Sequence, residues 1–152
     1  MSNFITGKVL RDLQLGMKVE RATANITTGL SLFTIAGGRI LLRALIGEVT
    51  TIIETKTVNF KLSLNPTTGT TTDLCANLDL SADEKGTLYT IAGNNPATAM
   101  QRGESGSVLG QATDVVCAIG TIDATVGATH TGSIKWTLFY IPIDDGASVA
   151  AA

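Results

Sequence analysis

Hydrophobic and polar residues alternate most clearly between residues 132 and 141. One side of an extended chain here would carry four large apolar residues, Ile134, Trp136, Leu138 and Tyr140. Aromatic and β-branched side chains favour the pleated, half-buried surface of a sheet, so the segment is predicted to be a strand facing the core. Pro142 has no amide hydrogen to donate, and we expect strand pairing to end there before the turn at 144–146.

A second alternating segment runs from residue 56 to residue 64 and places four apolar residues on its inner face, Val58, Phe60, Leu62 and Leu64. In residues 31–36, Phe33 and Ile35 alternate with Leu32 and Thr34. Strands are also expected at residues 70–80, 114–119 and 121–126. A loop is expected at 81–86, a long polar, glycine-rich loop at 94–110, and a frayed tail at 147–152.

Residues 39–54 are the ambiguous part of the pattern, because the spacing of their apolar residues also suits a helix. Gly47 and the β-branched run at 49–53 argue against a helix, and strand-like segments flank this stretch on both sides. The segment is predicted to be one long strand bent near Gly47.

Residues 1–30 have a different pattern and are predicted to form an N-terminal arm. A short helix at residues 8–15 is an alternative, but the apolar spacing does not follow a clean period of 3.6. Two interpretations remain open: a poorly ordered terminus with one edge strand, or an extended arm that docks on another subunit. The candidate docking residues are Phe4, Ile5, Leu10, Leu13 and Leu15.

These segments together predict an all-β protein. Seven or eight strands separated by turns, with no convincing helix, are typical of a single antiparallel β-sandwich or jelly-roll-like domain. We place that domain at residues 31–152, after the arm at 1–30.

Composition narrows the function classes. The chain has 152 residues, a formal net charge of −2 and only 16% charged residues, and its Lys and Arg residues are scattered. Neutralising several phosphates requires a basic stripe, so nucleic-acid binding is not expected. No apolar run reaches the roughly 18 residues of a membrane helix, and no secretory signal begins the chain, so we expect synthesis in a cytoplasm and no membrane partner.

No pattern of catalytic or metal-binding residues stands out. Cys75 and Cys117 lack metal-ligand spacing and are expected to be small buried thiols, although one disulfide remains open. His130 lies in a Thr/Gly turn and is expected to be an exposed loop residue. The acidic pairs at 83–84 and 144–145 are expected to be solvated strand ends. We therefore expect no enzyme, no cofactor and no metal.

Two stretches carry a family resemblance: LFTIAGGRILL with LIGEVTT (residues 32–42 and 45–51), and GSIKWTLFYIPIDDGA (residues 132–147). The chain resembles small structural proteins of tailed-bacteriophage virions over residues 32–147, with a weaker middle. The sequences of these motifs are distinctive, but the motifs have no chemical mechanism of their own. They point to a function by similarity to other proteins, not by their chemistry.

Small all-β virion proteins of this size are similar to head decoration, or cement, proteins. The resemblance implies a non-enzymatic protein, commonly a homotrimer, that binds the major capsid protein on the outer surface of the phage head and stabilises it. Its location would be the virion, assembled in the host cytoplasm. A tail, neck or fibre component is the alternative within the virion, and a β-sandwich carbohydrate-binding module is the alternative outside it.

Overall fold

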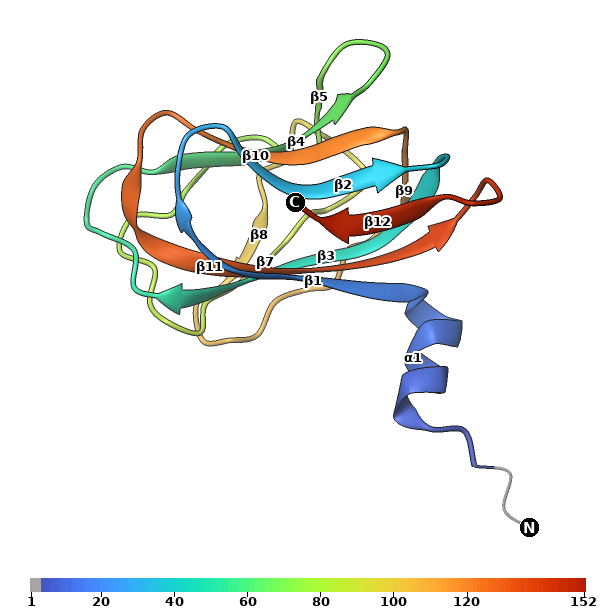
Figure 1. The fold of residues 1–152 in the computed structure, drawn as a ribbon. Helices are drawn as coiled ribbons and strands as arrows, with labels where there is room; N and C mark the ends of the chain where they lie inside the picture. The colour runs from blue at the N-terminus through green and yellow to red at the C-terminus, as the bar shows by residue number, and fades with distance from the viewer. Residues whose placement is uncertain (1–3) are drawn as a thin grey trace.

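The computed structural model describes residues 4–152 and consists of two antiparallel β-sheets packed face to face, with one short helix at the N-terminal end (Figure 1). In chain order the elements are α1 (Gly7–Leu15), β1 (Met17–Ile26), β2 (Leu30–Ala36), β3 (Ile40–Thr51), β4 (Asn59–Pro66), β5 (Thr72–Asp73), β6 (Leu78–Asp79), β7 (Leu88–Thr90), β8 (Gln101–Gly103), β9 (Val115–Cys117), β10 (Gly120–Val126), β11 (His130–Pro142) and β12 (Ser148–Ala151). The all-β sandwich class predicted from the sequence is confirmed.

The strand order shows how the two layers are built. Sheet A has the order β1-β11-β3-β7-β8, with β9 also paired to β3. Sheet B has the order β12-β2-β10-β4-β5, with β6 also paired to β4. The chain crosses between the layers several times, so each sheet combines strands that are far apart in the sequence.

β11 lies inside sheet A, between β1 and β3, and its predicted inner face is confirmed. Ile134, Trp136, Leu138 and Tyr140 are each no more than 2% exposed, and pairing ends at Pro142 as expected. The Trp136 ring stacks on Phe60 of β4, with centroids 5.8 Å apart and an interplanar angle of 7°. This contact joins the two sheets at the centre of the core.

The alternation predicted for β4 is also confirmed, because Val58, Phe60, Leu62 and Leu64 are all buried. β2 differs from the simple alternation, since Leu32 and Phe33 are adjacent and both fully buried. The pairing with β10 shifts register at this point, between Ile122 and Asp123. A β-bulge inserts an extra residue into one strand, which explains how two successive side chains enter the core.

Residues 40–51 form a strand, as predicted, but no irregularity in its pairing with β11 marks Gly47. The register between β3 and β11 shifts instead near Arg43 and near Thr50. Gly47 lies in regular pairing opposite Trp136, and its role is to leave room for the indole.

The predicted strand at 70–80 is also wrong, because only the two-residue strands β5 and β6 form there. Between them, Cys75 turns inward and its Sγ accepts a hydrogen bond from the Leu62 amide at 3.3 Å. The Cys75 thiol thus takes the place of a backbone carbonyl as the acceptor for this β4 amide. The pairing of residues 70–80 with β4 is therefore interrupted between β5 and β6.

Both ends of the chain contribute more to the sandwich than the sequence suggested. Residues 148–151, expected to fray, form β12 and pair with β2, and Val149 is buried. Met17–Ile26 forms β1 and pairs with β11. The predicted arm boundary at residue 30 therefore lies too far along the chain: of the described N-terminal residues, only 4–15 stand outside the sandwich, and we refer to them as the arm.

Candidate interaction surface

The arm is helical because both ends of α1 are capped. The Thr6 side chain accepts a hydrogen bond from the Val9 amide at 3.3 Å, and Gly16 ends the helix with a φ of 85°. Lys8 and Asp12, one turn apart, form an ion pair at 2.6 Å. A short helix at residues 8–15 is only an alternative from the sequence, because its apolar pattern is too short to show a clear period.

The apolar side of α1 faces away from its own domain. Val9, Leu10 and Leu13 share one side of the helix and are 45%, 53% and 68% exposed. The half-buried helical residues are instead the charged Arg11 and Asp12. A surface helix normally buries its apolar face against the core, so α1 has the opposite orientation.

All five residues predicted for docking lie on the arm and are exposed. Phe4 and Ile5 precede the helix and are 86% and 63% exposed, while Leu15 is 36% exposed. Leu10 and Leu13 share the outward side, but Leu15, two residues further on, points to the opposite side. Val9 was missed, and the helical spacing of 9, 10 and 13 is the signal that could have identified it.

We call Val9, Leu10 and Leu13 the arm face. The arm projects from one end of the sandwich (Figure 1), and none of the helix residues is buried.

Gly16 fixes the point at which the arm leaves the sandwich. A Cβ at this position would lie 2.1 Å from the Tyr140 carbonyl oxygen and 2.9 Å from Cγ1 of Ile141. Its positive φ also disfavours any other residue. The arm therefore begins in close contact with the end of β11.

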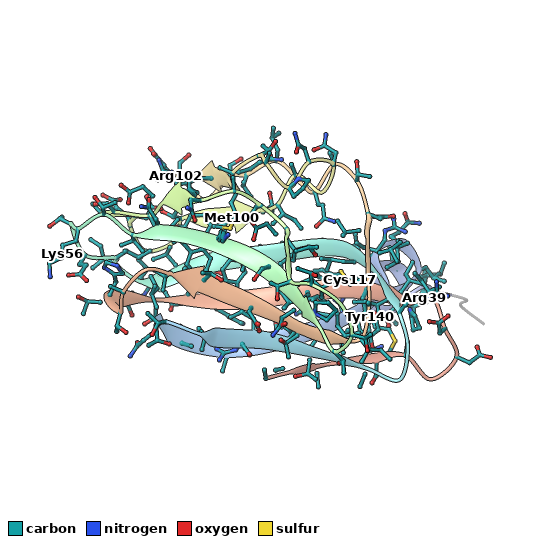
Figure 2. All side chains as sticks on the ribbon, turned by 90° about the horizontal axis from the view of Figure 1, so that it is seen from above. Arg39, Lys56, Met100, Arg102, Cys117 and Tyr140 are labelled. Atoms are coloured by element: carbon teal, nitrogen blue, oxygen red, sulfur yellow. The ribbon has the colours of Figure 1, made fainter. Side chains whose placement is uncertain are left out.

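A second apolar surface lies on the outer face of sheet A at this same end. Ile141, Leu41 and Val116 are direct cross-strand neighbours on β11, β3 and β9. Leu41 and Ile141 are half-buried, whereas Val116 is 59% exposed. We call these three residues the outer row. In the view of Figure 2, the adjacent residues Tyr140 and Cys117 lie at the end of the sandwich that carries α1.

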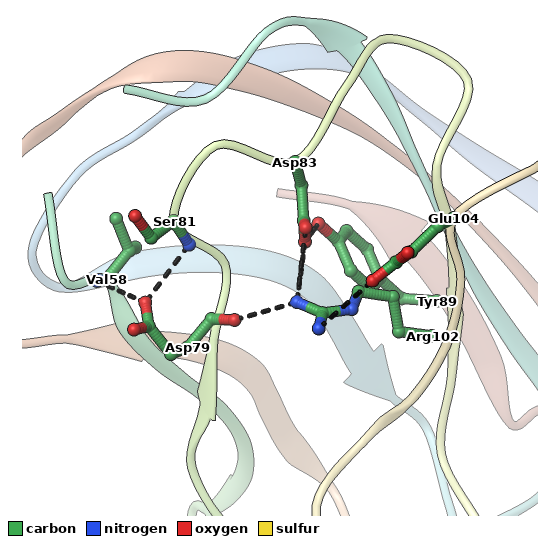
Figure 3. A network of polar contacts seen from close by, with 7 residues as sticks. All are labelled: Val58, Asp79, Ser81, Asp83, Tyr89, Arg102 and Glu104. Atoms are coloured by element: carbon green, nitrogen blue, oxygen red, sulfur yellow. Dashed lines mark hydrogen bonds and ion pairs between the residues drawn. The ribbon is translucent and has the colours of Figure 1, made fainter. Parts of the chain in front are cut away.

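A polar network surrounds Arg102 (Figure 3), which lies away from the end of the sandwich that carries α1 (Figure 2). Asp83 is only 7% exposed, so the prediction of a solvated strand end is wrong for this residue. Its carboxylate accepts hydrogen bonds from the Tyr89 hydroxyl and from Nη1 of Arg102, the latter at 3.1 Å. Arg102 also donates to the Asp79 carbonyl at 3.0 Å. Burial and the bond to Asp83 raise the pKa of Tyr89.

This network borders a pocket of about 350 Å³ lined by residues such as Ser81, Glu84 and Thr87. The charged groups of Asp83 and Arg102 are already paired with each other. The arrangement therefore fixes the loop after β6 onto β7 and β8, and we assign it a structural role.

His130 is another correction, because its side chain is only 9% exposed where an exposed loop residue was expected. Its Nδ1 lies 3.0 Å from Oε1 of Glu54, which also accepts from the Thr131 amide at 3.0 Å. The Thr131 hydrogen bond is the main cause that lowers the pKa of Glu54. These contacts tie the start of β11 to the segment after β3.

Both cysteines are free and buried, as the sequence favoured. Burial raises the pKa of Cys75 to about 11 and that of Cys117 to about 12. Among residues 4–152, no group of three or more His, Cys, Asp and Glu side chains is placed to hold a metal ion. Within the same part of the chain, no helix is long and apolar enough to cross a membrane.

A scan against protein-family models found no match, and neither did searches of curated proteins and of solved structures. The features that bear on function are therefore the geometry of the arm and the resemblance of the two sequence stretches described above.

Proposed function

We propose that this protein is a structural, non-enzymatic component of a phage virion, of the head decoration or cement type. It would bind the major capsid protein on the outer surface of the head and stabilise the shell. It would act as a homo-oligomer, and we propose a trimer as its oligomeric state. The motifs at residues 32–51 and 132–147 suggest the virion. The exposed apolar residues of the arm suggest a contact with another subunit, either a sister copy or the shell protein.

The observation that carries this proposal is the outward apolar face of α1. Exposed Leu10 and Leu13, together with Phe4 and Ile5, place several large apolar side chains in water on a segment that adds no buried residue to the sandwich. Contiguous exposed apolar surface of this kind marks an interaction site. A binding role explains why a folded domain carries such an arm.

The placement of the aromatic residues favours a structural role over sugar binding. The tryptophan, both tyrosines and three of the four phenylalanines are buried, and Phe4 on the arm is the exception. A carbohydrate module needs an aromatic platform at its surface, which requires side chains such as Trp136 to be accessible. They are instead used to fill the core.

The test is binding to purified phage heads assembled without this protein. We expect co-sedimentation at a fixed number of copies per head, raised resistance of the heads to heat, and loss of both effects in a variant lacking residues 1–15. The matched control is Ile52→Asp, which changes an apolar residue of 59% exposure on the sandwich itself.

Two results would replace the proposal. Binding to isolated tails or necks, with none to heads, would place the protein elsewhere in the virion. Specific retention on a glycan array that survives removal of the arm would identify a carbohydrate-binding module.

A further inference from the structure

We infer that the arm of one copy binds the outer row of a second copy, so that the subunits are joined head to tail by exchanged arms. This inference rests on the proposed function in one respect, that the arm is a binding device. It goes further by naming the partner as the same chain and by naming the receiving surface.

In its observed orientation, the arm does not pack its apolar face against its own domain. The arm leaves the sandwich at Gly16, which is packed against Tyr140 and Ile141. From that point α1 turns the half-buried, charged Arg11 and Asp12 toward its own domain and the arm face away from it. The arm thus begins next to its own outer row yet leaves Val116 of that row exposed.

The two surfaces match in size and chemistry. Neighbouring strands lie about 4.8 Å apart, so a row across three strands is about 10 Å long. The arm face extends over about 6 Å of helix from Val9 to Leu13, at 1.5 Å per residue, and Phe4 and Ile5 extend it toward the N-terminus. Both surfaces are built from aliphatic side chains.

Charged residues near both apolar surfaces already have partners within their own chain. Near the outer row, Arg39 pairs with Asp144 at 2.8 Å and Arg43 pairs with Asp114 at 3.1 Å. On the arm, Lys8 and Asp12 neutralise each other. Docking would therefore set an apolar centre inside a rim of charges that already have partners, which is the usual anatomy of a protein interface.

The proposed contact is also compatible with a closed, symmetric oligomer. Each chain offers one arm and one row, which are different surfaces, so the contact is heterologous and can close into a ring. In such a ring every arm face and every outer row is covered. Packing of arms on arms, or of arms on the shell alone, would leave Val116 exposed in every copy.

Complementation between two defective variants tests this. The arm variant is Leu10→Asp with Leu13→Asp, which keeps the row; the row variant is Val116→Asp, which keeps the arm. We expect wild type to be a closed oligomer by native mass spectrometry at micromolar concentration, and each variant alone to be monomeric. A mixture of the two should give a one-to-one heterodimer that does not grow, because only one intact arm meets one intact row. Ile52→Asp changes a residue that directly follows the other end of β3 and is also 59% exposed; this variant should remain a closed oligomer.

A cross-link checks the same contact without introducing charge. In a variant with Leu13→Cys and Val116→Cys, oxidation should join chains into covalent oligomers, whereas either single substitution should not give these products. Buried Cys75 and Cys117 should stay unreacted. Circular dichroism of each variant confirms that the sandwich is folded.

Three outcomes would overturn the inference: a row variant that remains oligomeric, a mixture that stays monomeric, or a wild-type chain that is monomeric in solution. The head-binding assay then separates the two proposals. A monomer that still binds heads through its arm removes the exchanged-arm contact and keeps the proposed function.

Discussion

Gly47 lies directly opposite Trp136 in the β3–β11 ladder, and the indole fills the space that a side chain at position 47 would occupy. A Cβ there would be 2.7 Å from Cζ3 and 2.8 Å from Cη2 of the ring. The same ring system stacks on Phe60 of sheet B. The glycine thus lets the bulkiest side chain of the core lie flat between the two sheets.

Gly47→Ala is expected to destabilise the fold by about 1–3 kcal/mol, the usual cost of overpacking a core. The methyl group would force the indole off its stacking position against Phe60. Chemical denaturation measures the loss of unfolding free energy. Gly127→Ala is the control, because a Cβ at Gly127 meets nothing within 4 Å, and an equal effect of both changes would contradict the packing explanation.

Trp136→Ala is expected to cost about 3–5 kcal/mol, because it removes a side chain that is 2% exposed and leaves a cavity. Thermal unfolding is the measurement. A variant that melts like wild type but no longer binds phage heads would show that Trp136 is a binding residue instead.

Deletion of residues 1–15 is expected to leave the sandwich folded, since α1 contributes no buried residue. The far-ultraviolet circular dichroism of the β-sheets should be preserved while oligomerisation or head binding is lost. Deletion of residues 1–26 is the comparison, because it also removes β1 from the edge of sheet A and exposes β11. If the shorter deletion already unfolds the protein, the arm is part of the fold and the binding surface must lie elsewhere.

The two thiols are expected to be dispensable for folding. Replacing Cys75 and Cys117 by Ala should cost about 1–2 kcal/mol of packing, less than the roughly 2–5 kcal/mol lost with a native disulfide. Burial and a raised pKa should make both thiols slow to react in the native state. In denaturant without reductant, a thiol reagent should modify both cysteines. Modification of neither cysteine would show that they form a disulfide.

Acid should weaken the link between Arg39 and Asp144. Two side-chain bonds, at 2.8 and 2.9 Å, and the Arg39 amide, at 2.8 Å, hold the pKa of Asp144 below its ordinary value. A folded pKa below the unfolded one stabilises the protein above about pH 3.9, and the contribution is lost as the pH falls below that.

The measurement for this prediction is the melting temperature of Asp144→Asn against wild type as a function of pH. The difference should be largest near neutrality and shrink from about pH 5 downward. Asp145→Asn, which changes an exposed neighbour with no ion pair among residues 4–152, should show no such trend. A pH-independent difference for Asp144→Asn would show that geometry alone, without charge, makes the contact.

Strand identity could be predicted from the sequence wherever one face is buried and the other is not. The alternation of Val58 to Leu64 and of Ile134 to Tyr140 depends on a side-chain period of two, which is a local property of the chain. The candidate docking residues could also be named, because apolar residues outside the alternating pattern stand out.

The pairing of the C-terminal strand, the burial of Asp83 and the direction of α1 were decided by tertiary structure, because they depend on residues that are distant in the sequence or on packing. Whether β12 frays or pairs depends on a free edge of β2 that is more than a hundred residues away in the chain. Burial of Asp83 depends on Arg102 and Tyr89, which come from two other strands. The direction of α1 was equally undetermined: nine residues fix which side of a helix is apolar, but only the packing at Gly16 decides that this side faces away from the sandwich.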